Sequence, residues 1–173
     1  MYYSIIIYCI IYKKFSAVKM TSIHKYKIIQ APKNRIFKII SDIEKYPEFL
    51  PWCSSVVIRH ISEDKKELTV ELNILFAGIR EKYISLVTID FENENFISSK
   101  LISGPLDNLY CAWQLKDLNS IETAIEFKLD FSFNSFALES LSKLIISKVT
   151  EKILDAFITR SDNLKNLYSQ YEK

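Results

Sequence analysis

Residues 41–53 read S-D-I-E-K-Y-P-E-F-L-P-W-C, and this stretch decides how the rest of the chain is interpreted. Asp42 can cap a short helix, and Pro51 ends it because the residue before a proline is disfavoured in helical angles. Large apolar side chains at this density in a turn either plug a core or line the mouth of an apolar cavity. Both interpretations stay open for the residues concerned: Tyr46, Phe49, Leu50, Pro51 and Trp52.

The segments on either side of this stretch predict regular structure. Residues 22–29 are expected to form a first strand, and Pro32 suits the first turn of a helix that buries an apolar stripe. After Trp52 the period changes from about 3.6 residues to 2, which is typical of antiparallel strands with one buried face. Short polar turns separate these segments, so about six more strands are expected in a meander. The clearest alternating set is Ile125, Phe127, Leu129, Phe131 and Phe133.

The helical period returns after Asn134 and Ser135, which make a good N-terminal cap. Residues 136–171 contain no Gly or Pro, so one helix of about 50 Å is predicted, with a break near residues 160–163 left open. An apolar stripe through Val149, Ile153 and Phe157 predicts the buried side of this helix.

This order of elements predicts an α+β domain of the helix-grip type. About seven antiparallel strands would form a curved sheet around the long C-terminal helix, with two short helices after the first strand. A sheet this curved leaves a gap that side chains do not fill, and we expect a tunnel whose mouth lies at the proline turns. Four further candidate ligand-binding residues are expected along the interior. Strand alternation places Trp113, Phe127 and Phe131 there, and the helical stripe adds Phe157.

Composition excludes several classes of function. The chain has 173 residues, of which 49% are hydrophobic, and a net charge of +2, so there is no electrostatic case for DNA binding. Two glycines are too few for a Gly-rich phosphate loop. Three cysteines without C-x-x-C spacing are expected to be free thiols in a reducing compartment, and no metal site is expected.

Residues 1–19 differ from the rest of the chain and are treated as an N-terminal extension of a single domain over residues 20–173. Their apolar part spans about 16 Å as a helix, well short of a bilayer core. One interpretation is a start-site artefact with Met20 as the true start. The other is a short membrane-surface anchor with basic flanks.

No constellation of residues predicts catalysis. His24 and His60 have no evident catalytic partner in the sequence, and no residue is identified as a general base for the Cys53 thiol. We therefore expect no catalytic residues, no cofactor and no enzyme activity.

The stretch 41–53 closely resembles the signature of the coenzyme Q-binding and ribosome-association-toxin family of START-like, polyketide-cyclase-type domains. Further segments resemble the family in the right order: residues 78–83, 101–106, 109–113, 127–133 and 156–160. The resemblance covers about residues 22–171. Leu106 and Ser161 depart from the usual Phe and Ala of the family.

The resemblance implies the helix-grip fold and two lines of function. One is binding of ubiquinone, a polyprenyl quinone, by a carrier or chaperone that supports respiration and contacts a membrane peripherally. The other is a toxin that binds the large ribosomal subunit and blocks subunit joining. We expect the first, in a cytoplasmic protein that associates peripherally with the inner membrane. Fold alone does not choose between the two.

Overall fold

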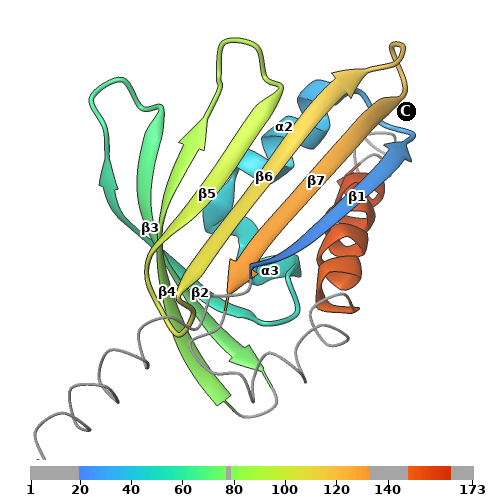
Figure 1. Ribbon diagram of the computed structural model, residues 1–173. Helices are drawn as coiled ribbons and strands as arrows, with labels where there is room; N and C mark the ends of the chain where they lie inside the picture. The colour runs from blue at the N-terminus through green and yellow to red at the C-terminus, as the bar shows by residue number, and fades with distance from the viewer. Residues whose placement is uncertain (1–19, 77–78, 133–147, 165–173) are drawn as a thin grey trace, which may run out of the picture.

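The computed structural model describes residues 20–76, 79–132 and 148–164 of the chain. Its elements follow the predicted order (Figure 1). They are β1 (Thr21–Ile29), α2 (Lys33–Ser41), a 3-10 turn η1 (Ile43–Lys45), α3 (Tyr46–Phe49), β2 (Cys53–Ile61), β3 (Glu67–Phe76), β4 (Ile79–Ile89), β5 (Phe96–Ser103), β6 (Asn108–Asp117) and β7 (Thr123–Ser132). Residues 148–164 are helical and are called the C-terminal helix below.

The strands form one seven-stranded antiparallel sheet in the order β1-β7-β6-β5-β4-β3-β2. Consecutive strands from β2 to β7 are neighbours, as the predicted hairpin turns require, and β1 closes onto β7. Register shifts occur between Cys53 and Ser55, between Ile58 and His60, and between Ile84 and Ser85. Such irregularities increase local twist and bend the strands, which helps the sheet to curve.

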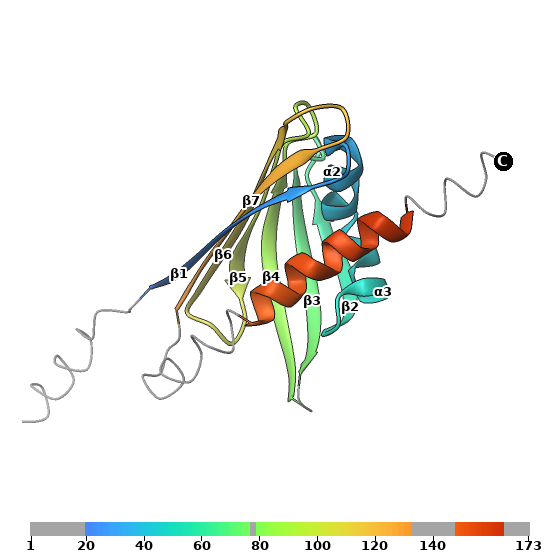
Figure 2. The same ribbon diagram turned by 90° about the vertical axis from the view of Figure 1, so that its right-hand side faces the viewer.

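The C-terminal helix crosses one face of the sheet, and α2 and α3 lie on that same side (Figure 2). We call this the concave face and the other the convex face. Alternation assigned the concave face correctly: Val70, Val87, Trp113 and Phe127 are all buried in one apolar core. Helix α2 adds the stripe predicted from its period, with Ile36, Phe37, Ile39 and Ile40 buried. The seven-stranded α+β helix-grip architecture expected from the sequence is therefore confirmed.

The helices confirm the predicted end before Pro51, but the predicted cap at Asp42 is wrong. Residues 43–49 form η1 and then α3, and Asp42 makes no side-chain capping bond to either. Helix α3 ends at Phe49, because Leu50 is already extended at φ −81° and ψ 120°. The C-terminal helix is unbroken across residues 160–163. The expected cap at Asn134 and Ser135 and the extension 1–19 lie outside the described residues.

Strand β1 breaks the apolar rule of the concave face. Its register with β7 pairs Lys25 with Phe127 and Lys27 with Ile125, so both lysines lie on the side that faces the C-terminal helix. Each pairs with an acidic residue of that helix: Lys25 with Glu151 at 2.9 Å and Lys27 with Asp155 at 2.7 Å. Tyr26, between them in sequence, points outward and is 63% exposed.

Candidate functional site

Five of the nine candidate ligand-binding residues form one continuous aromatic cluster. Phe157 of the C-terminal helix is its centre, with ring centroids 5.0 Å from Phe49, 5.3 Å from Tyr46 and 4.9 Å from Trp113. Trp113 in turn lies 4.5 Å from Phe127. All these pairs are edge-to-face, the arrangement that aromatic quadrupoles favour. Through the C-terminal helix, the cluster joins the sheet to the turn of residues 46–52, which consists of α3 and the three residues after it.

Tyr46 is fixed on the inner side of this turn. Its hydroxyl donates a hydrogen bond of 2.5 Å to the Ile40 carbonyl at the end of α2. Burial raises the pKa of Tyr46 well above its usual range, so the phenol stays protonated. Tyr46 and Phe49 therefore plug the core from the α3 side, and Leu50 is half-buried against the same core.

Pro51 and Trp52 lie on the outer side of the turn. Pro51 is exposed, and Trp52 is half-buried with the Lys152 ammonium 5.7 Å from its ring centroid. The stretch therefore contains both plug and rim residues. Tyr46 packs into the core, Phe49 is half-buried between the core and the surface, and Pro51 and Trp52 lie at the surface.

A surface groove of about 390 Å3 runs between this turn and the C-terminal helix. Phe49, Pro51 and Ala156 supply its apolar surface. Its polar lining consists of Glu48, Lys152, Asp155, Thr159, Arg160 and Asn163. The groove thus combines an apolar floor with charges of both signs.

Arg160 holds the groove together at one end. Its guanidinium donates to Glu48 at 2.6 Å and lies 5.5 Å from the Phe49 ring centroid. Hydrogen bonds from Lys45 and Arg160 lower the pKa of the Glu48 carboxyl, so it stays ionised and paired. In the sequence, Arg160 ends the segment 156–160 that resembles the family, and no sequence signal identified Glu48 as its partner.

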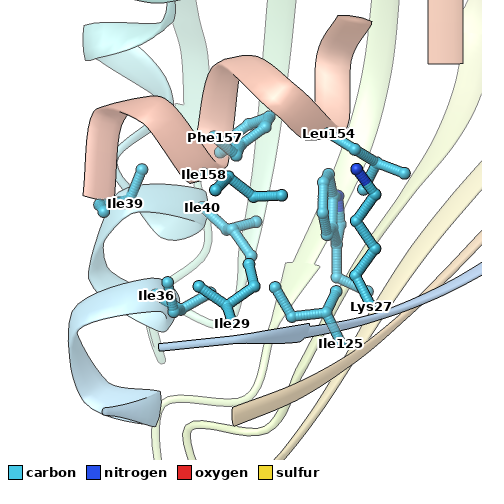
Figure 3. Close-up of a pocket in the computed structure, with 10 residues that line it drawn as sticks. Lys27, Ile29, Ile36, Ile39, Ile40, Ile125, Leu154, Phe157 and Ile158 are labelled. Carbon is cyan, nitrogen blue, oxygen red and sulfur yellow. The ribbon is translucent and has the colours of Figure 1, made fainter. Parts of the chain in front are cut away.

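Behind the aromatic cluster lies a small apolar void of about 10 Å3 (Figure 3). It is lined by Lys27, Ile29, Ile36, Ile39, Ile40, Trp113, Ile125, Leu154, Phe157 and Ile158. This volume is about the minimum for one water molecule, whereas ligand pockets span about 300–1,000 Å3. The open tunnel expected from sheet curvature is thus absent from this part of the described core, because Leu154, Phe157 and Ile158 of the helix fill it.

The remaining candidate is Phe131, which is 1% exposed near the end of β7 and is not among the residues that line the void. Of the ten lining residues, only Trp113 and Phe157 were candidates from the sequence, and no buried face was assigned to Lys27, Leu154 or Ile158. Leu154 was left out of the predicted stripe, although it is 2% exposed. Lys27 was missed because a lysine in a strand is expected to face water.

Among the described residues there is no group of three or more His, Cys, Asp or Glu side chains that could hold a metal ion. Burial raises the pKa of Cys53 to about 11 and that of Cys111 to about 12, so both thiols stay protonated and weakly nucleophilic. His24 lies on the convex face, where its Nε2 contacts Glu126 at 2.6 Å, remote from the void lining.

Across the residues that the structure describes, no helix is both long and apolar enough to cross a bilayer.

The profile of the polyketide cyclase/dehydrase and lipid transport family matches residues 29–158. The chain therefore belongs to this family, in agreement with the resemblance found in residues 41–53.

Individual relatives point in two directions. The chain is 35% identical to the ribosome association toxin RatA of Rickettsia prowazekii (strain Madrid E), over 82% of this chain and 97% of the relative. It is 28% identical to the mitochondrial coenzyme Q-binding protein COQ10 of Dictyostelium discoideum, over 85% of this chain and 72% of the relative. These relatives are named as a toxin and as a binding protein.

Among solved structures, the Zhui aromatase/cyclase from Streptomyces sp. R1128 superposes with a TM-score of 0.75 at 14% identity. The match covers 83% of this chain and 94% of that one. At this level of identity the likeness concerns the fold alone.

Proposed function

We propose that this protein is a non-enzymatic carrier of a hydrophobic ligand, a polyprenyl quinone such as ubiquinone. The observation that carries the proposal is the position of Phe49 and Phe157. Phe49 lines the surface groove, Phe157 lines the core void, and their rings lie 5.0 Å apart. Two aromatic side chains therefore form the wall between an open groove and an apolar interior.

In the structure this wall is closed. A quinone ring needs far more than 10 Å3, so binding requires the two rings to separate and the helix residues behind them to shift. The isoprenoid tail then extends outward over Phe49 and Pro51 in the groove.

The energetics suit a carrier. Burying a tail is worth roughly 0.8 kcal/mol per methylene against water. Against a bilayer that gain nearly cancels, because the tail already lies in hydrocarbon. A protein of this kind exchanges its ligand with a membrane surface, and the exposed Pro51 beside Trp52 suits a peripheral contact.

The test is lipid extraction after gentle purification. We expect a quinone to co-purify with the wild-type protein, and Phe49→Ala or Trp52→Ala to lower its occupancy. Ile153→Val, a conservative change on the C-terminal helix, serves as the control. Absence of quinone from wild-type extracts, together with no uptake of added ubiquinone from vesicles, contradicts the proposal.

A second candidate function is association with the large ribosomal subunit, favoured by the 35% identity to the relative named RatA. RNA contact requires unpaired cations on one face. Arg80 and Lys100 are exposed on the convex face. Their neighbours Arg59 and Lys82 are partly neutralised by Glu71, at 2.7 Å and 3.8 Å.

Sucrose-gradient sedimentation at low salt separates the two candidates. Cosedimentation with the large subunit that Arg80→Glu and Lys100→Glu together abolish supports ribosome association. Absence of the protein from subunit fractions removes this candidate and leaves the quinone proposal unaffected.

A further inference from the structure

Lys27 is the charged residue in an otherwise apolar lining. Nine of the ten residues around the void are aliphatic or aromatic. The register of β1 with Ile125 of β7 places Lys27 on the concave face, and Figure 3 shows its side chain rising from β1 toward the turn of the helix that carries Leu154. Its methylene chain therefore forms part of the wall of the void.

The ammonium of Lys27 is held at the edge of the void by a partner that is itself open to water. The Nζ atom donates to Asp155 Oδ1 at 2.7 Å, with the two side chains 38% and 63% exposed. An ion pair this exposed is weak, so exchanging one partner for another costs little. The Asp155 carboxylate can return to solvent when the ammonium turns inward.

A ligand with a carbonyl needs a hydrogen-bond donor here. A buried acceptor without a donor is costly, and the lining offers few alternatives. Apart from Lys27, one other residue of the lining carries a side-chain donor, the indole N–H of Trp113. Lys27 is a donor whose present partner, the exposed Asp155 carboxylate, a ligand oxygen can replace at little cost.

We propose that Lys27 recognises the polar head group of the ligand, its ammonium donating to a ring carbonyl oxygen in place of Asp155. This inference rests on the proposed quinone-carrier function and adds an orientation to it. The ring enters first and lies against β1, while the tail trails past Phe157 toward the groove.

Lys25 provides a matched control on the same strand. It lies on the same face of β1, pairs with Glu151 at 2.9 Å and is 30% exposed, but it is not among the residues that line the void. If the lysines only fasten the helix, removing either ammonium has the same effect. If Lys27 contacts the ligand, only its removal changes ligand selection.

The experiment measures binding of two probes to the wild-type protein, Lys27→Met, Lys27→Arg and Lys25→Met. The probes are a ubiquinone with a single isoprene unit and an isoprenoid alkene of similar length without the ring. Methionine keeps an unbranched apolar stem of similar length and removes the charge, while arginine keeps a donor. Unfolding curves establish that each variant is folded.

We expect Lys27→Met to bind the quinone roughly tenfold more weakly, the loss typical of one hydrogen bond to a charged donor, and to bind the alkene normally. Lys27→Arg should retain most of the quinone affinity, and Lys25→Met should match the wild type. Equal quinone affinity in Lys27→Met and Lys25→Met overturns this inference alone. Wild-type protein that binds neither probe overturns the proposed function, and this inference with it.

Discussion

The two long edges of the C-terminal helix are closed by different chemistry. On the α3 edge, Phe157 packs on Phe49 and Tyr46, and Arg160 reaches Glu48 over the Phe49 ring. On the β1 edge, two ion pairs join the helix to the strand: Lys25–Glu151 and Lys27–Asp155.

Aromatic burial on one edge and ion pairs on the other contribute differently to stability. Burial of aromatic surface contributes most of the stability and is insensitive to salt. Exposed ion pairs contribute little and are screened. The α3 edge therefore holds the helix in place, while the β1 edge supplies the charged residue of the void lining, Lys27.

The largest effect is expected from breaking the α3 edge. Phe157 is 4% exposed, so Phe157→Ala should lower the free energy of unfolding by about 3–5 kcal/mol, through lost burial and the cavity left behind. Urea denaturation measures this loss. Ile153→Val, a single methylene removed from a half-buried position on the same helix, should cost less than about 1.5 kcal/mol. Similar losses in the two variants would mean that the aromatic edge has no special role.

The next effect is smaller and is a gain in stability. It is expected at Ser161, on the core side of the C-terminal helix. Ser161 is fully buried, and its hydroxyl has no hydrogen-bond partner in the part of the chain that the structure describes. Ser161→Ala should raise stability by about 1 kcal/mol, because it removes an unsatisfied polar group and improves helix propensity. Thermal unfolding checks this, with Ser54→Ala, at an exposed position, as the control. A fall in stability would show that the hydroxyl has a partner.

Removing the two ion pairs of the β1 edge should lower the free energy of unfolding by about 1 kcal/mol or less, and this loss should depend on salt. The double variant Lys25→Met/Lys27→Met should lose stability relative to the wild type at low ionic strength. The difference should disappear near 1 M salt, where the screening length is about 3 Å. Phe157→Ala, measured in parallel, should show the same loss at both salt concentrations. A salt-independent loss in the lysine variant would assign these residues a packing role.

The smallest expected effect is the pH dependence of the stability that the Glu48 carboxylate contributes on the α3 edge. The folded pKa of Glu48 is lowered from 4.5, so its contribution is present above that value and is lost as the pH falls through the lowered pKa. The stability difference between wild type and Glu48→Gln should therefore shrink below about pH 4.5 and be constant above it. Denaturation at a series of pH values tests this. A difference that grows on acidification would contradict the assigned pairing of Glu48 with Lys45 and Arg160.

Prediction from sequence succeeded where a feature is local. Period-2 alternation identified the strands and the inward faces of Trp113 and Phe127, because successive side chains in a strand point to opposite sides. It failed for Lys27, whose inward position depends on the register of β1 with Ile125 of β7, and whose ion-pair partner Asp155 lies 128 positions away. The aromatic stretch 46–52 was located correctly, but its division into inner and outer residues needed the contacts with the helix.

The sequence by itself determined the family, the order of elements and the set of aromatic residues, since these follow from motif and periodicity. Only the tertiary structure decided how closely the helix approaches the sheet. That distance depends on the side chains of three separate segments meeting in one place: β1, α3 and residues 148–164. Because Leu154, Phe157 and Ile158 fill this part of the space under the curved sheet, the described core holds here a void of about 10 Å3 with a lysine at its edge, where the pattern alone predicted an open tunnel.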